Sequence, residues 1–154
     1  MKKLKINKIE SFLECSNISS PTIELMPGDA SSRKYARIFY ENKSKILMDD
    51  NDTENLNKFI NNAKIYKNIN LSIPKIYNKN TKEGLLLLED FGKETFSYYI
   101  ENNKISDYLY ETAVDVIIKM QSAVIPKELE VFSESRILKE VSIFLDWAVP
   151  YYFK

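Results

Sequence analysis

Apolar residues near the start of the chain recur at roughly helical spacing, and further along they form short extended runs. The spacing between Leu4 and Leu13 predicts an amphipathic helix over residues 4–16. Three short apolar runs with polar turns between them then predict strands, at 23–26, 35–40 and 45–48. With a polar connection at 41–44, these strands favour an antiparallel meander.

The middle of the chain returns to a helical pattern before two further extended stretches. Apolar positions predict a helix over 53–68, and Asp52 is a candidate N-cap because its carboxylate can accept backbone N–H groups. An extended stretch is predicted at 75–77 and a polar turn at 78–84. The continuous apolar run 85–88 fits a buried strand, although periodicity alone does not distinguish it from a buried helix.

After Gly92 the pattern is helical to the end of the chain. Helices are predicted over 94–102, 109–123 and 134–149, and Pro150 is expected to stop or kink the last of them. The order is therefore helix, three strands, helix, two strands and then helices. This order predicts an α+β fold built on a five-stranded antiparallel sheet.

Composition narrows the class of protein. The 154 residues are 44% hydrophobic, as in a globular protein, and 22 basic residues balance 22 acidic ones, so no nucleic-acid partner is expected. No stretch approaches the roughly 20 apolar residues that span a bilayer, so no membrane partner is expected either. The single cysteine, Cys15, indicates a reducing compartment and is expected to be a small core residue. We therefore predict a cytoplasmic protein.

The predicted turn between the first two strands carries the segment Pro27-Gly28-Asp29-Ala30-Ser31-Ser32-Arg33-Lys34-Tyr35. Gly28 allows close approach of the backbone, Ser31 and Ser32 add hydroxyl donors, and Arg33 and Lys34 add positive charge. Such groups suit a phosphate ligand. The alternative interpretation is a polar β-turn with a solvated basic pair.

Together with Leu85-Leu86-Leu87-Leu88-Glu89-Asp90-Phe91-Gly92, this turn resembles the small lobe of phosphotransferases with the protein-kinase-like fold. The resemblance is to the aminoglycoside/sugar phosphotransferase family, and within it to bacterial kinases of the cell-wall amino sugars N-acetylmuramate and N-acetylglucosamine. In those kinases a Gly-Asp-Ala-Ser-x-Arg-x-Tyr segment matches the turn, and a later Glu-x-x-x-Phe-x-x-Trp segment matches Glu140, Phe144 and Trp147.

The resemblance implies an organisation and a set of ligand-binding residues. Residues 1–88 would form the nucleotide-binding small lobe, 89–92 the hinge that contacts adenine through its backbone, and 93–154 the first helices of the large lobe. ATP with Mg²⁺ is the implied cofactor, and a sugar is the implied acceptor in a full-length enzyme. The residues expected to bind the nucleotide are Gly28, Asp29, Ser31, Ser32, Arg33, Met48, Glu89, Asp90 and Phe91.

Two departures limit what the resemblance implies. Many kinase-like enzymes place a lysine near the end of the third strand to pair the α- and β-phosphates, but Met48 and Asp49 stand there in this chain. Arg33, Lys34 and Lys45 remain as alternative cations. The family also draws its base and metal ligands from a later His-x-Asp-x-x-x-x-Asn segment, and this chain has no histidine.

We therefore expect the chain to be the truncated front part of a sugar kinase, with no catalytic residue and no metal ligand of its own. One alternative is a non-catalytic, kinase-like protein whose aromatic C-terminal helix is buried by a partner. Another is an unrelated small α+β binding domain, in which case both motif matches are accidental.

Overall fold

The computed structural model describes residues 6–28, 33–102, 104, 106–124, 126–127, 129 and 131–152. The chain divides into two compact units, Met1–Ser122 and Ala123–Lys154. The predicted division into a lobe over 1–88, a hinge over 89–92 and a helical part over 93–154 stays a prediction.

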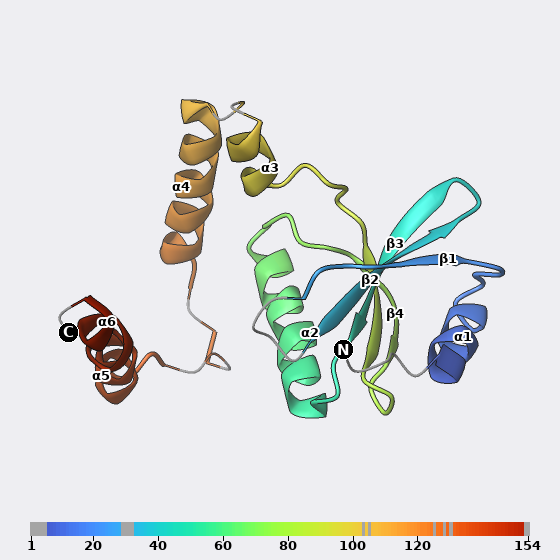
Figure 1. Ribbon diagram of the computed structural model, residues 1–154, viewed down its shortest axis with the longest axis horizontal. Coiled ribbons are helices and arrows are strands. Elements are labelled where there is room, and N and C mark those ends of the chain that lie inside the picture. The colour runs from blue at the N-terminus through green and yellow to red at the C-terminus, as the bar shows by residue number, and fades with distance from the viewer. Residues whose placement is uncertain are drawn as a thin grey trace. The chain divides into compact units, whose positions relative to one another are not determined.

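The first unit holds a sheet and four helices (Figure 1). Its elements in chain order are α1 (Ile6–Glu14), β1 (Thr22–Leu25), β2 (Lys34–Tyr40), β3 (Lys43–Asp49), α2 (Thr53–Asn68), β4 (Ile76–Asn80), β5 (Leu85–Glu89), α3 (Phe96–Glu101) and α4 (Asp107–Ser122). The second unit holds α5 (Glu134–Ile143), a π-helical turn η1 (Phe144–Ala148) and α6 (Val149–Tyr152).

The five strands form one sheet in the order β1-β2-β3-β5-β4, and every neighbouring pair is antiparallel. The predicted α+β class with a five-stranded antiparallel sheet is confirmed, and the arrangement is consistent with a kinase-like small lobe followed by helices. The run 85–88 is the buried strand β5, between β3 and β4, which removes the helical alternative for this segment.

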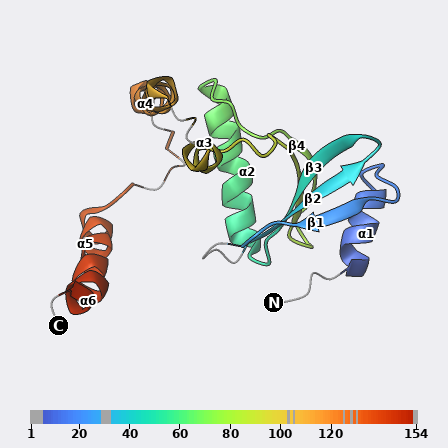
Figure 2. The same cartoon turned by 45° about the horizontal axis from the view of Figure 1, so that its top comes forward.

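Alternation along the strands sends side chains to two faces of the sheet, which α1 and α2 cover from opposite sides (Figures 1 and 2). On the α1 face, side chains of β2, β3 and β5 pack against Ile9, Phe12 and Leu13. On the α2 face, Met48, Leu86 and Leu88 pack against Leu56 and Ile60. Burying each such side chain contributes about 1.5–3 kcal/mol, so β5, which is buried on both faces, anchors the two cores.

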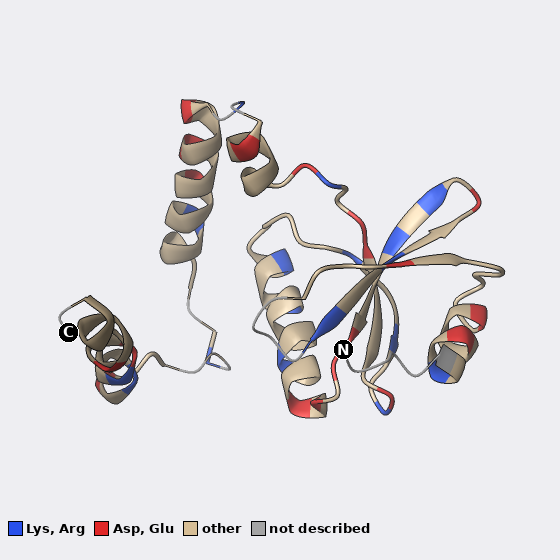
Figure 3. Cartoon of the chain, in the orientation of Figure 1, with Lys and Arg blue, Asp and Glu red and all other residues tan. Residues whose placement is uncertain are grey.

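Helix α2 begins where the sequence predicts. The Asp52 side chain accepts hydrogen bonds from the backbone N–H groups of Glu54 and Asn55, and therefore satisfies two donors of the first turn. Figure 3 shows the acidic first turn of α2 and basic positions further along the helix. This charge order is favourable for the helix dipole.

The turns differ from the sequence expectation. The β2–β3 connection is only Glu41 and Asn42, both with positive φ (46° and 60°), so Lys43 and Ser44 belong to β3. A two-residue turn of this handedness matches the twist of the strands it joins. Strand β4 also extends to Asn80, because its pairing with β5 continues past a bulge between Ile76 and Asn78.

One further expectation was wrong, and another was wrong in part. Cys15 is exposed and not a core residue, because α1 ends at Glu14 and its inward positions are already occupied by Phe12 and Leu13. Pro150 does not stop the last helix, since helical backbone continues to Tyr152, and a kink there stays a prediction. The π-helical turn η1 precedes Pro150, and the backbone N–H of Val149 bonds to the carbonyl of Phe144.

Candidate functional site

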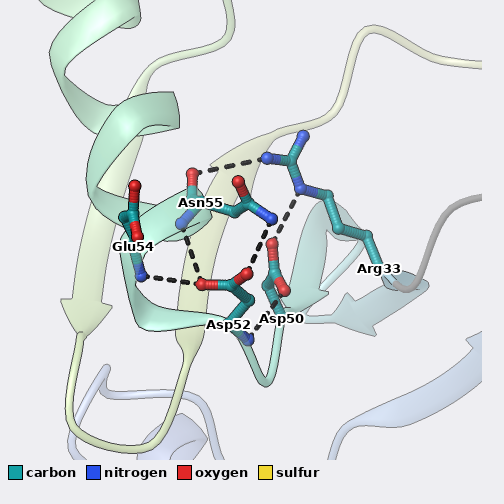
Figure 4. A network of polar contacts seen from close by, with 5 residues as sticks. All are labelled: Arg33, Asp50, Asp52, Glu54 and Asn55. Carbon is teal, nitrogen blue, oxygen red and sulfur yellow. Dashed lines mark hydrogen bonds and ion pairs between the residues drawn. The ribbon is translucent and has the colours of Figure 1, made fainter.

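Arg33, the first described residue after Gly28, belongs to a polar network at the start of α2 (Figure 4). Gly28 is exposed, and a Cβ added there would meet no atom within 4 Å. Of the other predicted residues in this turn, Asp29, Ser31 and Ser32 lie outside the described residues. Arg33 is described, and its side chain reaches from the end of the turn toward α2.

Asp50 forms the centre of this network. Its side chain is 1% exposed, and its Oδ2 accepts a hydrogen bond of 2.9 Å from Nε of Arg33. Its Oδ1 accepts the backbone N–H of Asp52 at 3.0 Å, so Asp50 also braces the residue that caps α2. A buried carboxylate is tolerated only when such partners replace its water shell.

Arg33 is held on three sides. Besides Asp50, its Nη2 donates a long hydrogen bond of 3.4 Å to the carbonyl of Asn55, and its guanidinium lies 5.6 Å from the centre of the Phe59 ring. The hydrogen bond to Asp50 raises the pKa of the guanidinium, against the opposing effect of burial. The Arg33 side chain nevertheless stays 28% exposed.

A second network fixes the segment after β5. Nε of Arg37 donates to Oδ2 of Asp90 at 2.7 Å, and Nη2 of Arg37 donates to Oδ1 of Asp90 at 3.1 Å and to the carbonyl of Gly92 at 2.9 Å. The two side chains are 8% and 4% exposed. This bidentate ion pair ties residues 90–92 to β2.

The ion pair also changes the acidity of Asp90. Burial acts to raise the pKa of this carboxyl, but hydrogen bonds from Arg37, Ser44 and the Gly92 N–H outweigh burial. The pKa of Asp90 is therefore lower than usual.

Glu89 and Phe91 lie beside an open groove of about 740 Å³ between α2 and β4. The Glu89 carboxylate accepts the backbone N–H of Lys75 at 3.0 Å, whereas Phe91 is 60% exposed. Within the described part of the chain, no hydrogen bond engages the backbone of Phe91. Such a backbone group remains available to a ligand.

Met48 differs from the other predicted site residues because its side chain is fully buried. It belongs to the core under α2, together with Leu56 and Leu86. The structure therefore places these predicted residues in two groups, Arg33 at the end of the turn and Glu89 to Phe91 at the end of β5. A ligand-binding role for any of them stays a prediction.

The charged partners in both groups were not predicted from the sequence. They are Asp50, the partner of Arg33, and Arg37, the partner of Asp90. Lys8, whose Nζ lies 3.3 Å from Asp49 and contacts the Glu83 carbonyl, was not predicted either. The available signal was the pair Asp49 and Asp50 at the end of an apolar strand, because carboxylates at a buried strand end require partners.

The described residues contain no group of three or more acidic, cysteine or histidine side chains placed to hold a metal ion. In the same part of the chain, the helices are too short or too polar to cross a membrane.

Comparison with known proteins points to kinases. The chain is 29% identical over 130 residues to the N-acetylmuramate/N-acetylglucosamine kinase of Pseudomonas aeruginosa, a match that covers 82% of this chain and 38% of that protein. It is also 29% identical over 122 residues to the protein of the same name from Pseudomonas putida, with 79% and 36% covered. No family model matches the chain.

The chain therefore spans less than two-fifths of the length of the curated relatives it matches. Both relatives are kinases, so the similarity supports the kinase part of the resemblance. The finer assignment to the aminoglycoside/sugar phosphotransferase branch stays a prediction.

Proposed function

We propose that this chain is the nucleotide-binding part of an ATP-dependent sugar kinase. The observation that carries the proposal is the similarity to two N-acetylmuramate/N-acetylglucosamine kinases over about four-fifths of the chain. The sheet order β1-β2-β3-β5-β4 with α2 inserted before β4 supports it, because this order suits a small lobe that binds a nucleotide.

ATP would be held by groups at the two ends of the α2 face. The backbone of Phe91, which makes no hydrogen bond among the described residues and lies next to the turn fixed by Arg37 and Asp90, suits the hydrogen-bonding edge of adenine. The Arg33 guanidinium suits the phosphates, since arginine presents several donors in a planar fork. These groups fit a nucleotide by charge and by donor type.

Phosphoryl transfer additionally requires a metal to neutralise the phosphates and a carboxylate to orient the acceptor hydroxyl. Neither role is assigned to a described residue. The chain's own contribution would be to bind and orient the nucleotide. The sugar acceptor, which we propose to be N-acetylmuramate or N-acetylglucosamine, would bind to the longer protein.

Nucleotide binding to the chain itself tests the proposal. Thermal unfolding should be followed by circular dichroism with increasing ATP, with and without MgCl₂, because a ligand of the native state raises the melting temperature. A hundredfold excess of ATP over its Kd would stabilise the fold by about 2.7 kcal/mol. Guanosine triphosphate and inorganic triphosphate serve as matched controls, since they carry the charge without adenine. A shift equally large with inorganic triphosphate would reject an adenine-nucleotide site.

The alternative of a non-catalytic partner protein makes a different prediction. It requires a stable complex, which light scattering after size exclusion would detect, and it requires no response to ATP.

Cytoplasmic localisation and the absence of nucleic-acid and membrane partners also remain predictions.

A further inference from the structure

The three cations considered for phosphate binding lie on different faces of the sheet. Lys34 shares a face of β2 with Ala36 and Ile38, which pack in the core under α1. Lys45 is paired with Ile38 across β2 and β3, so it lies on that same face. Its Nζ is 4.2 Å from the centre of the Tyr77 ring. Of the three, Arg33 is therefore the one that reaches the α2 face.

Arg37 also lies on the α2 face, but its guanidinium is already engaged. It makes a bidentate ion pair with Asp90, donates to the Gly92 carbonyl and is 8% exposed. An arginine in this position fixes the chain after β5. Arg33 differs because it retains 28% exposure and lines a small cavity of about 290 Å³ at the side of α2, together with Lys58 and Asn62.

Asp50 determines where the Arg33 guanidinium lies. This carboxylate is itself fixed, because it is 1% exposed and its second oxygen accepts the backbone N–H of Asp52. In Figure 4 the Nε edge of Arg33 faces Asp50, and Nη2 faces the Asn55 carbonyl. Holding a long side chain in place before a ligand arrives lowers the entropy lost on binding.

We infer that Arg33 is the residue that contacts the nucleotide phosphates, and that Asp50 is the positioning residue that holds it there. The inference rests on the proposed nucleotide site and adds to it the identity of the phosphate-binding cation. In this arrangement Arg33 at the end of the β1–β2 turn, held by Asp50 just after β3, binds the phosphates. In other kinase-like enzymes a lysine on the third strand has this role.

The experiment compares the affinities of adenosine and ADP by isothermal titration calorimetry on the full chain. The dissociation constant of adenosine divided by that of ADP is the ratio that measures the contribution of the phosphates alone. Arg33→Ala should lower that ratio about tenfold or more and leave the affinity for adenosine unchanged, as expected for lost charge-assisted hydrogen bonds. Arg33→Lys should recover part of the ratio.

Lys45→Ala is the matched control, because it removes the same charge from the opposite face of the sheet. A lowered ratio in Lys45→Ala with an unchanged ratio in Arg33→Ala would overturn the assignment. Wild-type chain that binds adenosine and ADP equally well would also overturn it, while the adenine site would stand. Wild-type chain that binds neither compound would reject the proposed function itself.

Asp50→Asn separates positioning from a structural role. If Asp50 positions Arg33, the ratio falls in this variant, whereas a structural role alone would lower the melting temperature and leave the ratio unchanged. Should Asp50→Asn fail to fold, Asp50→Glu keeps the charge but displaces it by one methylene group. An unchanged ratio in Asp50→Glu would equally reject positioning by Asp50.

Discussion

Removal of the Asp90 carboxylate should be among the more damaging changes in the first unit. Asp90→Ala leaves Arg37 without its partner at a position where Arg37 is 8% exposed, and the Gly92 N–H loses its acceptor. Breaking a fully buried pair from one side costs about 3–5 kcal/mol. Because Phe91 beside it is exposed, we expect the lower end, about 3 kcal/mol.

Urea unfolding followed by far-ultraviolet circular dichroism measures this loss, and hydrogen exchange of the β2 and β5 amides localises it. Lys93→Ala is a close control, since Lys93 follows Gly92 in sequence and its contact with Glu24, at 4.0 Å, is exposed. We expect that control to change stability by less than about 0.5 kcal/mol.

A double variant tests the electrostatic reason for the loss. Arg37→Met combined with Asp90→Leu replaces both charges by apolar groups, and it should recover much of the stability lost in Asp90→Ala. The reasoning would be refuted if Asp90→Ala changed stability no more than Lys93→Ala. It would also be refuted if the double variant lost as much free energy of unfolding as its two single variants lose together.

Four further predictions concern other features of the chain. First, because the pKa of Asp90 is lower in the folded state, its contribution to stability is complete above its unfolded pKa of about 3.9 and is lost as pH falls from that value through the folded-state pKa; the urea midpoints of wild type and Asp90→Ala should therefore approach each other as pH falls below about 3.9. Second, Gly84→Ala should destabilise by more than about 2 kcal/mol in thermal melts, because the new Cβ would meet the Asp50 carbonyl oxygen at 2.0 Å and φ is +74°, whereas Gly28→Ala should have little effect on stability. Third, Asp52→Ala should cost about 1 kcal/mol by loss of the α2 cap, measured by urea unfolding, and Asp52→Asn should restore most of it. Fourth, Cys15 should react with a thiol reagent in native buffer at nearly the rate seen in urea, and strong protection would contradict its exposure.

The order of helices and strands could be predicted because the local apolar pattern and the burial of each element agree. The run from Leu85 to Leu88 is apolar at every position, as a strand covered on both faces requires, and Asp52 stands where an N-cap is needed. Turn lengths were less predictable. Glu41 and Asn42 adopt positive φ without a glycine, because the pairing of β2 with β3 dictates the geometry.

The site could be predicted only in outline. Position in sequence identified Arg33 and Asp90, but their partners Asp50 and Arg37 lie 17 and 53 residues away along the chain. Which face of the sheet a cation occupies depends on strand register, and register distinguished Lys34 and Lys45 from Arg33. A local pattern can show that a buried charge needs a partner, but it does not show which distant residue supplies it.

The location of the single tryptophan allows the second unit to be followed by fluorescence. Trp147 lies in η1 of the second unit and is 77% exposed, while the sheet carries tyrosines such as Tyr35 and Tyr40. Selective excitation of indole therefore reports on the surroundings of Trp147 in the second unit, and circular dichroism averages over both units. Comparing the two signals in one melt would reveal whether the sheet and the terminal helices unfold as a single cooperative transition or in two steps.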